Sequence, residues 1–163
     1  MDTVKSAAWP LLFTYNGPVF GNGFLSYVEL CGKLLAVQET EGVWLEGVNP
    51  GAFAIGATTL EKANQTLPEA LTKVFVDFAE TTDSFEAFKR TVEDFYEATD
   101  PETTSAWDRA VEAVRDGLMP VPEGLLRKPG WKCFVRVTER SLDQLTPRDN
   151  PPVVFNRQLA AAA

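Results

Sequence analysis

Four short β-rich segments follow one another between residues 24 and 56, separated by only a few turn residues. The segments are Phe24–Leu30, Leu34–Gln38, Val43–Val48 and Ala52–Gly56. Turn residues lie between them, at Cys31-Gly32-Lys33, Glu39–Gly42 and Asn49-Pro50-Gly51. Such short connections join antiparallel neighbours, because parallel strands need a crossover of about a dozen residues or more. The pattern therefore predicts an antiparallel meander of three to four strands.

The residues that precede this meander contain three breaker signals, at Trp9-Pro10, Asn16-Gly17-Pro18 and Gly21-Asn22-Gly23. We therefore expect residues 1–22 to form an irregular N-terminal arm. Residues 23–145 are expected to form a single α+β domain, and residues 146–163 a C-terminal tail. A chain of 163 residues with 45% apolar residues suits one packed domain of this kind.

Three helices are predicted after the meander. Apolar residues recur at helical spacing between Leu60 and Phe78, and Thr58 and Glu61 have the spacing of a capping box. Pro68 interrupts this pattern and predicts either a kink or a helix that restarts at Thr66. A second helix is expected from Asp83-Ser84, and a third from Asp100-Pro101 to Gly117.

A further half-exposed strand is expected at Trp131–Thr138, where apolar and charged residues alternate. Together these elements predict an α+β fold: an antiparallel three-to-four-stranded meander, helices packed on one face, and a returning C-terminal strand. The helices at about 81–116 would be an insertion into this domain.

The absence of histidine excludes several kinds of active site. Histidine-based acid–base catalysis, Ser-His-Asp and Cys-His nucleophiles, and most zinc sites all need that residue. The two cysteines, Cys31 and Cys133, form no metal or redox motif, and each lies in an apolar run. Two buried thiols are the favoured interpretation, and a disulfide is the alternative.

The formal net charge of −8, from 23 acidic and 15 basic residues, speaks against a protein that binds nucleic-acid phosphates. The charge is uneven, since residues 1–116 carry 8 basic and 19 acidic side chains, whereas residues 117–163 carry 7 and 4. An acidic surface serves solubility, or it attracts a basic partner. No apolar stretch reaches about 18 residues, and the N-terminal apolar run is too short for a signal peptide, so a soluble, cytoplasmic protein is expected.

The segment GVWLEGVNPGAFAIGATTLEKA, residues 42–63, resembles the HicB-like antitoxin family in its order of strand, Pro-Gly turn, strand and Gly-x-Thr-x-x-Glu helix start. The resemblance runs from about Leu34 to Phe78. It resumes more weakly at 116–122 and at the expected strand Trp131–Thr138. It implies a compact meander followed by a helix, described for that family as a partial RNase H-like fold without the nuclease carboxylates.

The resemblance further implies a non-catalytic antitoxin that occludes a small basic ribonuclease toxin. The partner-binding residues would be Glu39, Glu41, Trp44 and Glu46, with Trp44 as an aromatic anchor. A core position on the helix-facing side of the sheet, beside Phe53, is the other interpretation of Trp44. The chain departs from the family in its two added helices and in lacking a C-terminal DNA-binding module, so no direct DNA binding is expected.

Two alternatives stay open. The chain could be an orphan HicB-like scaffold that forms a homodimer, or that binds another protein through its extra helices, with Trp131–Thr138 as an open edge strand. It could also be a carboxylate-based enzyme, although Glu29, Glu39, Glu41 and Glu46 show no two-metal layout and are more typical of a solvated sheet face. We therefore predict no catalytic residue, no cofactor, no metal and no membrane partner.

Overall fold

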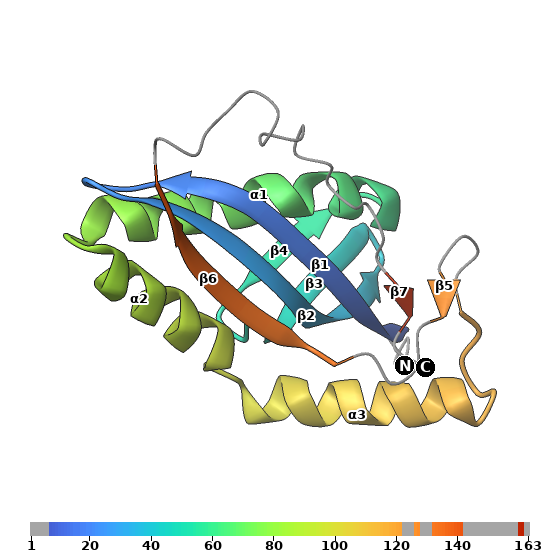
Figure 1. Ribbon diagram of the computed structural model, residues 1–163. Helices are drawn as coiled ribbons and strands as arrows, with labels where there is room; N and C mark the ends of the chain where they lie inside the picture. Colours follow the sequence, from blue (N-terminus) through green and yellow to red (C-terminus); the bar gives the residue numbers. More distant parts are fainter. Residues whose placement is uncertain (1–6, 122–125, 128–131, 142–159, 162–163) are drawn as a thin grey trace.

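The computed structural model describes residues 7–121, 126–127, 132–141 and 160–161. Four strands come first, β1 (Ala8–Phe20), β2 (Leu25–Glu39), β3 (Gly42–Asn49) and β4 (Ala54–Ala57). Three helices follow, α1 (Leu60–Thr81), α2 (Phe85–Glu97) and α3 (Pro101–Arg115). The later strands are β5 (Leu126–Arg127), β6 (Phe134–Arg140) and β7 (Ala160–Ala161). The predicted α+β class, with an antiparallel meander, helices and a returning strand, is confirmed (Figure 1).

The first strand lies where an irregular arm was predicted, so that prediction is wrong for Ala8–Phe20. β1 pairs with β2 along its whole length without a register shift. Gln38 N–H donates to the Ala7 carbonyl, which makes the odd-numbered residues of β1 the hydrogen-bonded partners of β2. Pro10 and Pro18 are even-numbered, so their nitrogens face away from β2. The breaker residues are accommodated because they need no N–H toward that partner.

The turn predicted at Cys31-Gly32-Lys33 is also wrong, because β2 continues through it. Gly32 lies opposite Phe13 of β1, and a Cβ atom at Gly32 would collide with the Phe13 ring and the Asn49 carbonyl. The glycine therefore permits close packing inside a strand rather than a reversal of the chain. A register shift against β3 follows immediately, between Lys33 and Leu34.

Two strands share one edge of β2, end to end. β3 pairs with the second half of β2, from Lys33 to Glu39. β6 pairs antiparallel with the first half, from Leu25 to Cys31. The other edge of β2 is taken by β1, so β2 is the central strand of the described sheet (Figure 1).

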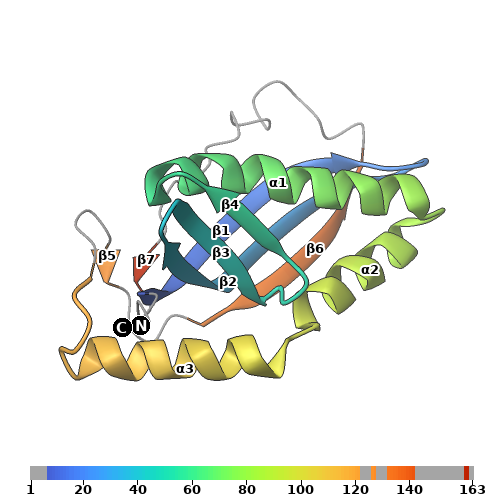
Figure 2. The same ribbon diagram turned by 180° about the vertical axis from the view of Figure 1, so that it is seen from behind.

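The main core lies between one face of the sheet and helices α1 and α2. α1 lies across this face, as Figure 2 shows, and α2 packs beside β6. Phe13 from β1, Phe75 from α1 and Phe88 from α2 are the largest fully buried side chains in it. These apolar stripes explain why both helices pack onto the sheet.

The third helix packs against the opposite face. In β1, Leu11 and Phe13 belong to the main core, whereas Leu12 contacts Val111 and Val114 of α3. Successive side chains of a strand point to opposite faces, so α3 lies on the side of the sheet away from α1. The expected packing of helices on one face therefore holds for α1 and α2, whereas α3 covers part of the opposite face.

The helix starts agree closely with the sequence. Ser84 caps α2 and Asp100 caps α3, both as predicted, and Pro101 occupies the first turn of α3. The cap of α1 is Thr59 rather than Thr58, and α1 continues through Pro68 without restarting. The Thr66 hydroxyl donates to the Lys62 carbonyl instead of capping a new helix.

None of the helices in the described part of the chain combines the length and apolar character that a membrane crossing requires.

Candidate partner-binding surface

One end of the face that carries α3 is left open. Leu35 and Val48 of this face are buried under Ala106, Trp107 and Ala110 of α3. Further along the same strands the cover ends. Val37 and Trp44, which are direct neighbours in the register of β2 and β3, are only partly covered. The β2–β3 end of the sheet therefore presents apolar surface to the outside.

Trp44 is the largest group on this open end, with 45% of its surface exposed. Gly56 of β4 lies opposite it, and the Trp44 ring covers the position that a side chain at Gly56 would occupy, at 3.1 Å from an ideal Cβ atom. Trp44 thus lies flat over a glycine on the outer face. The prediction that Trp44 fills the helix-facing side is wrong, whereas Phe53 is buried in the main core as expected.

The predicted acidic residues lie at the same end of the sheet as Trp44. Glu46 is two residues along β3 and shares its face, and Glu39 is two residues beyond Val37 on β2. Glu41 lies in the turn that joins the two strands. Glu39 and Glu46 thus lie on the sheet face that carries the exposed indole, and Glu41 lies in the adjoining turn.

These carboxylates differ from Glu29 in their ion pairing among the described residues. None of Glu39, Glu41 and Glu46 takes part in an ion pair with the described residues. Glu29, the other strand glutamate, differs in this respect, because its Oε2 lies 3.4 Å from Arg136 Nη1 of β6. This end of the sheet therefore combines an exposed aromatic ring with glutamates that form no ion pair in the described part of the chain.

The sequence did not indicate two of the residues that shape this surface, Val37 and Gly56. Val37 was counted as one apolar residue of a short strand, and its facing is fixed only by the true register of β2 against β3. Gly56 is predicted as the last residue of the fourth strand, and the pattern does not indicate that its missing side chain leaves room for the Trp44 ring. The signal that identifies both residues is the strand register, which places Val37 and Gly56 on either side of Trp44.

None of the large exposed apolar side chains among the described residues lies on α2 or α3. α2 buries Phe88, Val92 and Tyr96 within the domain, and α3 buries Ala110, Val111 and Val114. Within the described residues, no three His, Cys, Asp or Glu side chains gather closely enough to hold a metal ion.

No protein family model matches this chain, and neither a curated protein nor a solved structure matches it.

Proposed function

We propose that this protein is a non-catalytic, antitoxin-like binding protein that occludes a small basic ribonuclease toxin. The open β2–β3 end would form the contact. The observation that carries the proposal is the exposed Trp44 ring on the sheet face shared with Glu39 and Glu46, with Glu41 in the adjoining turn. The resemblance of residues 42–63 to the HicB-like antitoxins gives the class of partner.

The chemistry of this surface supports a basic protein as the partner. Aromatic residues surrounded by polar groups are the usual anchors of protein interfaces, because a large rigid ring loses little conformational entropy on binding. Complementary charge raises the association rate and selects against acidic partners. The partner is therefore expected to bring Lys or Arg side chains against the glutamates and an apolar pocket against Trp44.

The test is co-expression with the product of a neighbouring gene that encodes a short basic chain, followed by affinity purification and binding measurements at low and high salt. A stable complex is expected. Trp44→Ala should weaken it by about 30-fold or more, the effect of removing an interface hot spot. The triple variant Glu39→Lys, Glu41→Lys, Glu46→Lys should reduce the association rate and the salt dependence.

A matched control reverses the same number of charges at the other end of the domain. Glu86, Asp94 and Glu97 are exposed residues of α2, which packs beside Phe24 at the start of β2. Changing these three to Lys should leave binding unchanged. Equal binding by the wild type and the β2–β3 triple variant, or absence of any complex at low salt, would contradict the proposal.

A homodimer is the second candidate, and the outer edge of β6 favours it. Within the described residues β6 pairs with β2 alone, so its other edge offers unpaired backbone groups to a second copy. Light scattering after size exclusion distinguishes the candidates: a dimer that persists at high salt without any basic partner supports this one.

A further inference from the structure

The two cysteines meet where β6 begins. The Cys31 Sγ and Cys133 Sγ atoms lie 3.6 Å apart, although 102 positions separate the residues in the sequence. Both are thiols in this structure. Cys31 is the last residue of β2 that pairs with β6, and Cys133 immediately precedes the first residue of β6. The expectation of two buried thiols therefore holds for Cys31, whereas Cys133 is only partly buried. Their closeness raises the question of what they do.

The geometry allows the two sulfur atoms to bond. A disulfide has an S–S length of about 2 Å, so the sulfur atoms must approach by roughly 1.5 Å. Cys133 lies just outside the strand ladder, where its backbone is not held by pairing to β2. Closing the gap would therefore call for a side-chain rotation and a backbone shift at Cys133, on the side that the strand ladder does not hold.

The two thiols differ in their access to solvent. Cys31 is 2% exposed, and the Tyr96 hydroxyl donates to its backbone carbonyl at 2.8 Å, which fixes it in place. Cys133 is partly exposed. A dissolved reagent would therefore meet Cys133 first, and Cys31 is positioned behind it.

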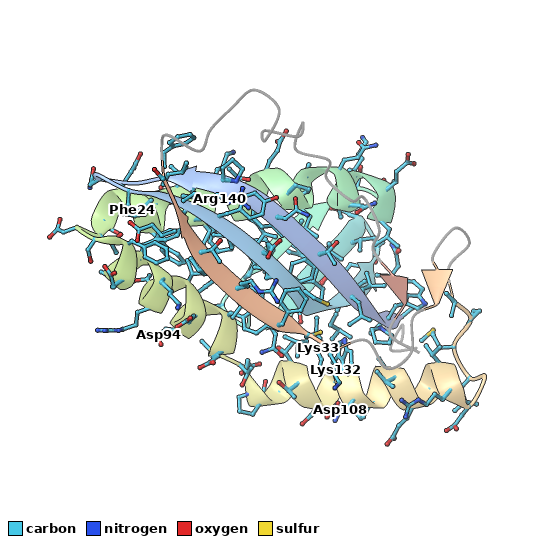
Figure 3. All side chains as sticks on the ribbon, viewed as in Figure 1. Phe24, Lys33, Asp94, Asp108, Lys132 and Arg140 are labelled. Atoms are coloured by element: carbon cyan, nitrogen blue, oxygen red, sulfur yellow. The ribbon has the colours of Figure 1, made fainter. Side chains whose placement is uncertain are left out.

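The surroundings favour the reactive form of Cys133. A hydrogen bond with the Cys31 thiol lowers the pKa of Cys133, against the raising effect of burial, and the Lys33 ammonium lowers it further. Lys33 Nζ lies 4.6 Å from the centre of the Trp107 ring, which holds the ammonium on this side of the sheet. Figure 3 shows Lys33 and Lys132 at the α3 end of β6, away from Arg140. Thiolates beside cations are the nucleophiles in disulfide exchange.

We propose that Cys31 and Cys133 are a dithiol site that takes small-molecule disulfides as its oxidant and closes reversibly to an intramolecular disulfide between β2 and β6. The Cys133 thiolate attacks one sulfur of the small disulfide RSSR, forming a mixed disulfide and releasing RS⁻, which takes up a proton. The Cys31 thiol then loses its proton and attacks the Cys133 sulfur, releasing the second RS⁻. The protein loses two electrons and two protons, and one RSSR becomes two RSH.

The first test uses the wild-type chain and oxidised glutathione under non-denaturing conditions. Intact mass should fall by about 2 Da, and both thiols should disappear from a thiol titration. Peptide mapping should find Cys31 joined to Cys133, and excess reduced thiol should reverse the change. The melting temperature should rise by about 5–10 °C, because the bond closes a long loop.

Two single-thiol variants give the order of attack. Cys31→Ala should accumulate the glutathione adduct on Cys133, since nothing can resolve it. Cys133→Ala should react at least ~10-fold more slowly, because only the buried thiol remains. Circular dichroism establishes that each variant is folded before its reaction is compared.

Three results would overturn the proposal: a wild-type chain that does not react, one that keeps glutathione attached to Cys133, or covalent dimers in place of the internal bond. The wild-type mass and peptide map decide among these without any variant. Binding of the basic partner does not enter this experiment, so its outcome is independent of the proposed function.

Discussion

Tyr15 connects the meander to the first helix through a single hydroxyl. Its oxygen lies 2.9 Å from Thr72 Oγ1, and Thr72 in turn donates to the Pro68 carbonyl at 2.8 Å. Burial raises the pKa of Tyr15, so the hydroxyl stays protonated and can donate. The link joins β1 to α1 in a partly buried position.

Removing this hydroxyl should destabilise the protein. Tyr15→Phe keeps the ring and its contact with Phe75, whose centroid is 5.2 Å away, but loses the hydrogen bond. We expect the free energy of unfolding to fall by about 1 kcal/mol, measured by urea denaturation. Tyr27→Phe is the control, because its hydroxyl makes only a 3.4 Å contact with Asn16. Equal losses in the two variants would argue against a special role for Tyr15.

Asp100 makes the stability of the N-terminal end of α3 depend on pH. Hydrogen bonds from the Thr103 hydroxyl and the Thr103 N–H lower the pKa of Asp100 in the folded state. A lowered pKa means that the charged carboxylate stabilises α3 above the pKa of the unfolded chain. This stabilisation is lost as the pH falls through the lower, folded pKa.

The variant Asp100→Asn separates this effect from capping itself, because asparagine caps a helix about as well as aspartate. Thermal melts between pH 7 and pH 2 should show a smaller acid-induced loss of stability for the variant than for the wild type. Identical pH profiles would show that Asp100 is not the group responsible.

At the scale of the elements, the sequence predicts best those boundaries that depend on contacts between residues close together in the chain. Ser84 and Asp100 marked helix starts correctly, because a cap is a contact between residues three positions apart. Pro10 and Gly32 resemble chain breakers in the sequence but lie inside strands, because their effect depends on residues elsewhere in the fold. A proline is tolerated where its nitrogen faces away from the neighbouring strand, and a glycine where another backbone approaches.

The candidate site shows the same division. Alternation along β3 predicts that Trp44 and Glu46 share one face of the sheet. How much of that face a helix covers depends on where α3 packs, and α3 lies more than 50 residues later in the sequence. The meeting of Cys31 with Cys133 likewise follows from the pairing of β6 with β2, which no local pattern encodes.

Pro68 offers a test of α1 as an element. Proline in a helix interior costs about 3 kcal/mol relative to alanine, of which up to about 1 kcal/mol is returned by a less flexible unfolded chain. Pro68→Ala should therefore stabilise the protein by about 2 kcal/mol in chemical denaturation. Pro101→Ala is the control, since proline at the first turn of α3 is well tolerated. A Pro68→Ala variant no more stable than the wild type would contradict this expectation.

At the scale of the whole molecule, the two faces of the sheet are unequal. The main core buries residues from β1, β2, β3, β6 and two helices, among them Phe13, Phe75 and Phe88. The α3 face rests on two small clusters, one around Leu12 and the other around Leu35 and Val48. Fewer buried contacts predict a lower local stability for α3 than for α1.

Native-state hydrogen exchange tests this inequality. Amides in the middle of α3, around Ala110 and Val111, should exchange through local opening that depends little on denaturant. Amides around Leu71 and Phe75 of α1 should exchange only with global unfolding. Equal protection of the two helices would show that the sheet and all three helices open as one unit.

The tandem placement of β3 and β6 on one edge of β2 also bears on how the chain is made. The ribosome synthesises the chain from its N-terminus. β2 can therefore pair with β1, and its second half with β3, long before residue 134 is added. During that interval the nascent chain presents the Leu25–Cys31 edge unpaired, with Val28 and Leu30 lacking the cover of Val137. β6 thus covers an edge of β2 that stays unpaired until late in translation, and a need for chaperones would be concentrated in that interval.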